Sequence, residues 1–186
     1  EIPLRLVGSE MCIRDRFTIE DCKNTGDIYG DAGNGVATIG GVIGETTRKG
    51  DNSSSTIKNC TNAGNLYGTG EIGGVIGAVN HGHIYTLNGE EIVSNGDNFL
   101  VEGCGNSGTI TVKKGADGTS SWAGGVFGKV NISKNGTVYI KDCGNSGSIY
   151  SENGKSDRNV DVLGGIGASL ENVGCADCLL YTSPSP

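Results

Sequence analysis

The sequence predicts an all-β fold, a β-solenoid of about four coils, and three observations favour it. One phrase recurs four times along the chain, a second phrase follows each copy, and the spacing within the phrases fits the two-residue period of a strand. No helical spacing of hydrophobic residues persists over the length that a helix needs. Successive copies are expected to stack, so that each repeat position forms a column with ~4.8 Å between neighbours.

The first phrase reads Cys-x-Asn-x-Gly, and a hydrophobic residue follows two positions after the glycine. Its copies lie at Ile19–Tyr29, Ile57–Tyr67, Val101–Ile110 and Ile140–Tyr150. Residues two apart in an extended chain share a face, so the cysteine, the asparagine and the glycine of each copy are predicted to point the same way. We expect two buried columns, one of free thiols with parallel Cβ vectors that disfavour disulfides and one of hydrogen-bonded asparagines. The columns comprise Cys22, Cys60, Cys104 and Cys143, and Asn24, Asn62, Asn106 and Asn145.

The second phrase is a hydrophobic residue, two glycines, two hydrophobic residues and a glycine. Its copies are Ile39–Gly44, Ile72–Gly77, Ala123–Gly128 and Leu163–Ala168, the last of which departs by placing Ala168 where the others have Gly. As one extended strand, it would place Ile39, Gly41 and Ile43 on one face and Val42 on the opposite face. The glycines are expected where a corner needs positive φ, or where a Cβ would collide with the neighbouring coil.

Both ends of the chain resemble translated adapter DNA from a sequencing library. Met11–Arg16 is what ATG TGT ATA AGA GAC AGx encodes, and Cys178–Ser183 is what TGT CTC TTA TAC ACA TCT encodes. These two strings are reverse complements over their shared length. We therefore expect residues 1–16 and 178–186 to be adapter-derived and without native structure. The natural segment, 17–177, then divides into repeats at about 17–54, 55–98, 99–137 and 138–177.

Composition excludes several classes of protein and partner. The chain has 34 Gly but only 3 Pro, without the period of collagen, and 35 % hydrophobic residues is too many for a plainly disordered chain. A net charge of −7 argues against nucleic acid and against an anionic membrane as partners. We expect a monomer that inserts no part of this segment into a membrane.

Two groups of residues suggest metal binding, and for each a structural role is the stronger prediction. His81 and His83, with Glu90 and Glu91 nearby, have zinc-ligand chemistry, but no third ligand follows at a suitable spacing, and a solvated loop is predicted. Three acidic loops could supply calcium with oxygens, but they match no calcium-loop pattern and are predicted to be ordinary turns. These loops are Gly30–Gly35, Asn95–Asn98 and Gly115–Gly118.

Catalytic and modified residues are not expected either. Asp21 and Asp142 occupy the same repeat position, but Asn59 and Gly103 stand there in the copies between, so we expect exposed strand-edge charges rather than paired catalytic carboxylates. Cys175-x-x-Cys178 mimics a redox pair only through an adapter-encoded cysteine. The sequons at Asn52, Asn59 and Asn131 are discounted, Asn59 because it is expected in a strand. The prediction is a chain that is not an enzyme, with no catalytic, cofactor-binding or metal-binding residues.

Together the two phrases resemble the GLUG-type repeats of bacterial secreted and cell-surface proteins, including those beside immunoglobulin A-cleaving metallopeptidase domains. The resemblance covers nearly all of residues 17–177. It implies a right-handed parallel β-helix in a secreted, often wall-anchored protein, and it implies neither one activity nor any catalytic residue.

The expected function is therefore a non-catalytic structural or adhesive module, whose loops contact a host or cell-wall glycan or protein. The alternative is an accessory β-helix region of a large extracellular peptidase or glycan-active enzyme, with its catalytic domain outside this chain. A third possibility, an ice-binding face, needs aligned Thr-x-Thr ranks, and only Thr109-Ile-Thr111 provides one.

Overall fold

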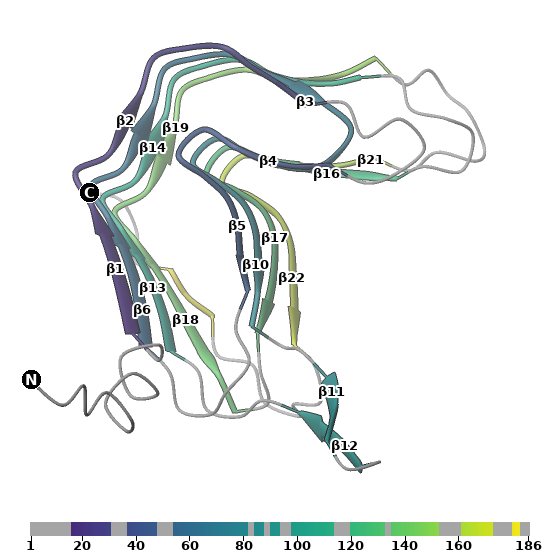
Figure 1. The fold of residues 1–186 in the computed structure, drawn as a ribbon. Coiled ribbons are helices and arrows are strands. Elements are labelled where there is room, and N and C mark those ends of the chain that lie inside the picture. The colour runs from purple at the N-terminus through teal and green to yellow at the C-terminus, as the bar shows by residue number, and fades with distance from the viewer. Residues whose placement is uncertain are drawn as a thin grey trace, which may run out of the picture.

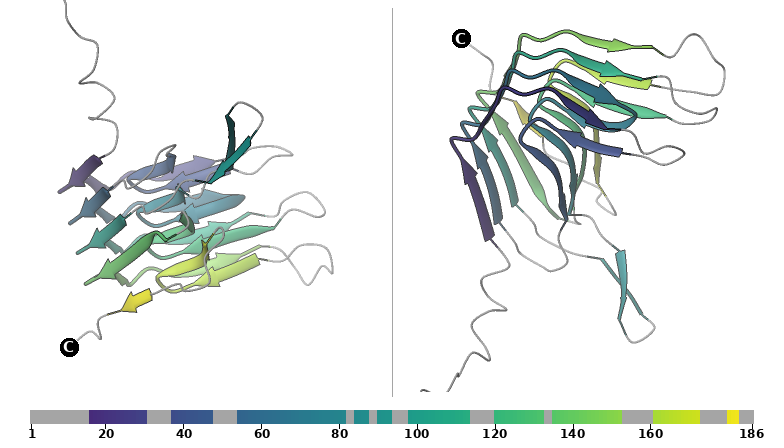
Figure 2. Two further views of the ribbon diagram at one scale, coloured as in Figure 1. Left: turned by 90° about the horizontal axis from the view of Figure 1, so that it is seen from below. Right: turned by 45° about the horizontal axis from the view of Figure 1, so that its top comes forward.

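The fold is all-β, as the sequence predicts, and its coils stack into a right-handed parallel β-helix (Figures 1 and 2). The computed structural model describes residues 16–30, 37–47, 54–81, 84–87, 90–93, 98–113, 120–132, 135–152, 161–172 and 180–182. Viewed along the axis in Figure 1, the chain turns clockwise as it recedes through four successive coils. The predicted fold class is confirmed.

Each coil consists of five short strands. The first coil holds β1 (Arg16–Glu20), β2 (Lys23–Asn24), β3 (Ile28–Gly30), β4 (Ala37–Gly40) and β5 (Ile43–Thr47). The second holds β6 (Ser54–Lys58), β7 (Thr61–Asn62), β8 (Leu66–Gly68), β9 (Gly70–Gly73) and β10 (Ile76–Asn80). The third holds β13 (Asn98–Glu102), β14 (Gly105–Asn106), β15 (Ile110–Val112), β16 (Ser121–Gly124) and β17 (Phe127–Ile132). The fourth holds β18 (Thr137–Lys141), β19 (Gly144–Asn145), β20 (Ile149–Ser151), β21 (Asp161–Gly164) and β22 (Gly167–Asn172).

Two further elements lie outside this pattern. The long excursion after the second coil contains an antiparallel hairpin of β11 (Ile84–Leu87) and β12 (Glu90–Val93). β23 (Leu180–Thr182) pairs in parallel with β18, although it lies in the segment expected to be adapter-derived. An open strand edge pairs with any extended segment, so this pairing does not depend on a native sequence.

Equivalent strands of successive coils form five parallel sheets. The sheets that begin with β1 and β5 face each other and form the wider body of the molecule, whereas those that begin with β3 and β4 face each other in a narrower arm (Figure 1). A hydrophobic core fills each part. Ile57, Val101 and Phe99 belong to the core of the body, and Leu66 and Ile110 to the core of the arm.

The first phrase folds as predicted. In the second coil Cys60, Asn62, Gly64 and Leu66 are buried, while the residues between them are less buried or exposed. Thiols and asparagines of neighbouring coils stand in register, so both predicted columns are confirmed, with their outermost members half-buried because those belong to the end coils.

The asparagine column is a continuous hydrogen-bonded ladder. Asn24 Nδ2 donates to Asn62 Oδ1, Asn62 Nδ2 to Asn106 Oδ1 and Asn106 Nδ2 to Asn145 Oδ1, each at 2.8 Å. Each Nδ2 also donates to the carbonyl oxygen of the glycine two residues later, at 2.8–2.9 Å. Asn24, Asn62 and Asn106 therefore use both amide protons, one to join the next coil and one to hold their own corner.

The second phrase differs from its prediction. It is not one strand: β9 ends at Gly73 and β10 begins at Ile76, with a corner between them. Val75 and Ile76 are both fully buried in the core of the body, so the expected placement of this valine position on the opposite face is wrong. The chain turns at the two glycines, and the two-residue alternation of an extended strand does not continue through such a turn.

The glycine corner receives the asparagine of the next coil. A Cβ at Gly41, Gly74 or Gly125 would lie 2.4–2.5 Å from a side-chain carbon of Asn62, Asn106 or Asn145, respectively. It would also lie 2.0–2.2 Å from a backbone carbonyl oxygen of the next corner. Both phrases are thus needed together, because the ladder occupies the space that the glycines leave.

A left-handed corner follows the first strand of every coil. Asp21, Asn59, Gly103 and Asp142 have φ of 53–64° at this one repeat position. Aspartate, asparagine and glycine are the residues that tolerate this conformation, and the position therefore accepts these three types. Asn59 lies in this corner and not in a strand, which corrects the expectation.

The ladder leads to a first stability prediction. Asn106→Ala removes two hydrogen bonds that the Asn106 side chain donates and leaves Asn62 Nδ2 without its inter-coil acceptor in a buried site, so the free energy of unfolding should fall by about 2 kcal/mol or more. Asn24→Ala, in the half-buried end coil, is the matched control and should cost about 1 kcal/mol. Urea denaturation followed by circular dichroism measures both; equal losses would contradict the importance of the buried ladder.

The glycine corner leads to a second prediction. Gly74→Ala should destabilise the fold by more than about 3 kcal/mol, because its Cβ meets a backbone oxygen at 2.0 Å and neither coil can move without breaking the sheet. Gly165→Ala is the control at the same repeat position, where no atom lies within 4 Å of the added Cβ. The two variants should differ clearly in thermal unfolding, and a similar loss in both would refute the packing argument.

Candidate functional site

The residues considered for chemistry are not brought together by the fold. Asp21 and Asp142 lie in the first and fourth coils, with Asn59 and Gly103 between them in the corner column. Asn59 Nδ2 donates to Asp21 Oδ1 at 3.1 Å, and Lys141 lies 3.6 Å from Asp142 Oδ2. Each carboxylate therefore has a local structural partner, and two intervening coils separate one from the other.

His81 is a core residue, which corrects its predicted place in a solvated loop. Its side chain is fully buried, with the ring centroids of Phe17 and Phe99 at 6.5 and 5.4 Å and Thr46 Oγ1 3.3 Å from Nε2. The backbone explains this, because residue 81 continues the inward parity of Val79 at the end of β10. His83 lies outside the described residues, as do most of the residues of the three acidic loops.

The part of the chain that the structure describes contains no group of three or more His, Cys, Asp or Glu side chains placed to hold a metal ion. Nor does any helix in the described ranges have the length and hydrophobicity to cross a membrane. The four column thiols are free.

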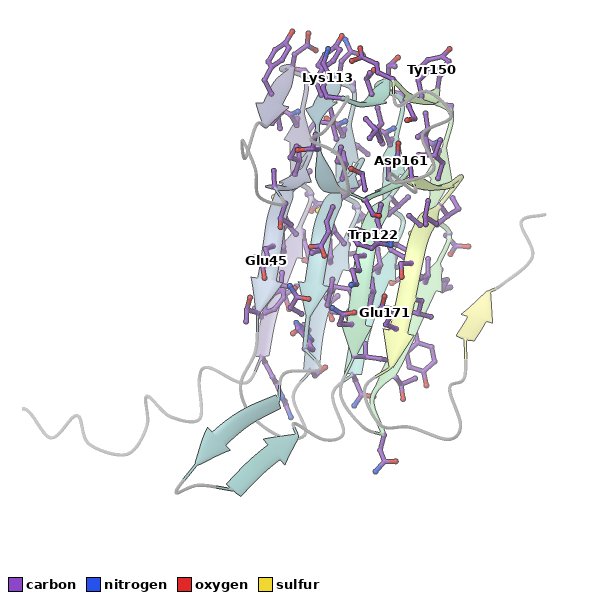
Figure 3. The ribbon with its side chains drawn as sticks, turned by 90° about the vertical axis from the view of Figure 1, so that its right-hand side faces the viewer. Glu45, Lys113, Trp122, Tyr150, Asp161 and Glu171 are labelled. Atoms are coloured by element: carbon purple, nitrogen blue, oxygen red, sulfur yellow. The ribbon has the colours of Figure 1, made fainter. Side chains whose placement is uncertain are left out.

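Two surfaces carry aromatic residues, and the first surrounds Trp122, which is half-buried. Trp122 of β16 stands between Glu71 of β9 and Val162 of β21, and it lies on the same side of the molecule as Glu45 and Glu171 (Figure 3). Lys129 Nζ lies 4.8 Å from the centroid of the Trp122 ring and 3.4 Å from Glu171 Oε1.

Lys129 organises this acidic surface. Burial raises the pKa of Glu71, Lys129 opposes that shift, and the nearby carboxylates of Glu45 and Glu171 reinforce it. The side chain of Lys129 is only 16 % exposed. Because the ammonium group covers the Trp122 ring, that ring is engaged within the protein and is a poor platform for a ligand.

The second surface, which we term the tyrosine column, runs along the outer side of the arm. Tyr29, Tyr67, Thr111 and Tyr150 stack in register on β3, β8, β15 and β20. The Tyr29 and Tyr67 rings are 4.8 Å apart and 4° from parallel. Tyr29 is 71 % exposed and Tyr150 57 %. This column presents phenol hydroxyls and ring surface to solvent.

Charged groups accompany the tyrosine column. Lys113 Nζ lies 5.4 Å from the centroid of the Tyr67 ring and 3.2 Å from Glu152 Oε1. Sequence reasoning did not identify this surface, although the signal was present: a tyrosine follows the hydrophobic residue that ends the first phrase in three of the four copies.

Two further features of the described surface have a structural explanation. Glu102 lies between Lys58 and Lys141, at 3.4 and 2.8 Å, and these lysines, Lys141 first, lower the pKa of Glu102. A shallow depression lies over the asparagine ladder, where Gly105 and Gly144 contribute no side chains. It is lined by Thr61, Asn62, Gly105, Asn106, Ser107, Gly144, Asn145 and Ser146.

Comparisons with known proteins give no match: no protein-family model, no curated protein and no solved structure matches the chain significantly.

The Trp122 surface leads to a prediction about pH. Because burial raises the pKa of Glu71, the folded chain retains this proton at a higher pH than the unfolded chain does. Protonated Glu71 stabilises the folded chain fully below the ordinary glutamate pKa. This stabilisation is lost as the pH rises through the raised pKa of Glu71. Glu71→Gln should therefore be more stable than the unmodified chain at pH 7, with the difference vanishing below about pH 4.

Thermal unfolding at pH 4 and pH 7 measures this effect. Glu20→Gln, at an exposed position on another sheet, is the control and should change little at either pH. A Glu71→Gln chain that is less stable than the unmodified chain at pH 7 would show that the attraction to Lys129 outweighs burial.

Proposed function

We propose that this chain is a non-catalytic structural and adhesive module of a secreted bacterial surface protein, related to the GLUG-type repeats. The tyrosine column carries the proposal. It places exposed aromatic side chains in register on a regular stack that the buried asparagine ladder ties together. A fixed row of amphipathic rings suits a repeating polymer better than a single small molecule.

The partner class that this surface suits is a host or cell-wall glycan. Sugar rings combine apolar C–H faces with hydroxyls, and tyrosine offers both an apolar ring and a hydrogen-bonding tip. Lys113 and Glu152 supply charged donors and acceptors beside the column. The contact is proposed on the sheet face of the arm, in addition to the loops that the sequence suggested.

A glycan-binding measurement tests the proposal. Tyr29→Ala combined with Tyr150→Ala should lower the affinity for a binding glycan, identified on an array of cell-wall and host glycans, by roughly tenfold through loss of stacked ring area. Tyr139→Ala is the matched control, because Tyr139 is also an exposed tyrosine but lies on β18 in another sheet. The proposal fails if the array shows no binding, or if both variants lose affinity equally.

The same column favours a second function, an accessory β-helix region of a large extracellular peptidase or glycan-active enzyme, since such regions hold a polymer near a separate catalytic domain. The assembled DNA on either side of this segment distinguishes the two. A peptidase zinc motif next to the repeats supports the accessory role, and a wall-sorting tail supports the adhesive one.

A further inference from the structure

The first and fourth coils leave both ends of the hydrophobic core partly uncovered by the described residues. Figure 2 shows the coils stacked in order, with the first and the fourth at opposite ends. Ile57 and Val101 of the inner coils are 0 % and 1 % exposed. Ile19 and Ile140, at the same register position in the end coils, are only partly buried. Each end therefore presents apolar side chains beside strand edges.

The asparagine ladder has an unused donor in the fourth coil and an unused acceptor in the first. Within the described residues, the side-chain amide of Asn145 donates only to the carbonyl oxygen of Gly147, whereas those of Asn62 and Asn106 also donate to the next coil. Asn24 Oδ1 accepts only from a backbone amide of its own corner. If the first coil of a second chain lay on the fourth coil, Asn145 would meet Asn24 as Asn106 meets Asn145.

The charges of the end coils are complementary as well. Glu20, Lys58, Glu102 and Lys141 occupy one register position, so acidic and basic residues alternate along the stack. Lys58 and Lys141 lie 3.4 and 2.8 Å from Glu102. A copy stacked on the fourth coil would continue this alternation, because it would place Glu20 next to Lys141. Such exposed pairs contribute more to register than to affinity.

We propose that the chain binds a second copy of itself head to tail, with the first coil of one copy stacked on the fourth coil of the other in the register of the inner coils. This contact covers the apolar ends, extends the ladder and continues the alternation of charge. It also pairs backbone groups, since Cys143 O would accept from Lys23 N as Cys104 O accepts from Gly144 N. Two different surfaces meet, so the contact does not close and produces linear chains of copies, where the sequence alone favoured a monomer.

Two features oppose this contact. β23 pairs with three residues of β18, and β1 of the second copy has to displace it, but β1 pairs with β6 through five residues and is the longer strand. Asp142 and Asp21 share the corner column and would become neighbours across the contact. Solvent and salt weaken the repulsion between exposed carboxylates, and Lys141 lies 3.6 Å from Asp142. Both costs are small beside the extension of five sheets.

Two glycines allow the contact to be blocked without a collision inside the chain. A Cβ at Gly165 has no atom within 4 Å, but the equivalent Cβ at Gly125 lies 2.4 Å from the asparagine of the next coil, so at the contact it would meet Asn24 of the second copy. A Cβ at Gly26 meets only Asn24 Oδ1, at 3.8 Å, but the equivalent Cβ at Gly64 lies 2.0 Å from a carbonyl oxygen of the preceding coil. Gly165→Ala therefore blocks one end, and Gly26→Ala blocks the other.

Sedimentation velocity over a range of concentrations measures the association. The full chain should form dimers and longer species as its concentration rises, and Gly165→Ala and Gly26→Ala should each lower the association constant at least about tenfold through overpacking. An equimolar mixture of these two variants should form dimers and nothing longer, because each supplies the end that the other lacks. Gly144→Ala is the matched control and should associate like the parent, since its Cβ meets no atom within 4 Å and the equivalent Cβ at Gly105 meets a carbonyl oxygen at an ordinary 3.6 Å.

Circular dichroism and thermal unfolding of each variant at low concentration should match the parent, so that a loss of association reflects the contact. If one blocked variant does not fold, the other decides. A parent chain that stays monomeric at every concentration, blocked variants that associate like the parent, or a mixture without dimers would each overturn the proposal.

This contact does not depend on glycan binding. Both blocked variants retain the tyrosine column and should bind glycan like the parent at concentrations where all chains are monomeric. Failure of one proposal therefore leaves the other to be judged separately.

Discussion

The structure depends on the asparagine ladder at the corner where the body meets the arm. Asn62 is 1 % exposed and lies between two hydrophobic cores, where an unsatisfied amide would be costly. It is tolerated because the coil spacing matches an amide–amide hydrogen bond, so each asparagine meets the next at 2.8 Å. The glycine corner provides the necessary space: Gly41 and Gly74 lie where any side chain would collide with this ladder. One interaction thus accounts for the co-occurrence of both sequence phrases.

Because the coils stack in a fixed register, the side chains of one column fill a common space. The size of each residue therefore limits the size of its neighbours in the column. The column of Ile43, Ile76, Phe127 and Gly167 illustrates this. A Cβ at Gly167 would lie 2.0 Å from Cζ of Phe127, so the large ring of one coil fills the space that the small residue of the next leaves empty. Repeats can therefore vary in sequence when neighbouring coils compensate, which keeps interior packing close to constant.

The same register gives the solenoid its proposed functions. A side chain that repeats on the outer side of a strand becomes a row on the surface, as in the tyrosine column, and a cysteine that repeats on the inner side becomes a row in the core. The first row is suited to a polymer, and the second packs within the core. The proposed polymer-binding row derives its geometry from the ~4.8 Å repeat and not from a converging pocket.

The sequence by itself determined the fold class, the number of coils, the inward direction of the first phrase and both buried columns, because stacking converts a repeat in sequence directly into a repeat in space. The tertiary structure decided what depends on corners and on contacts between coils. The chain turns at Gly73 and Gly74, which brings Val75 into the core against the two-residue alternation. His81 is buried because the chain keeps the inward parity of Val79 for one residue beyond the end of β10, where the sequence suggested a polar loop. The stacking of the Tyr29 and Tyr67 rings and the position of Lys129 over Trp122 depend on distances between side chains far apart in sequence. A repeat pattern predicts only that such residues are near each other.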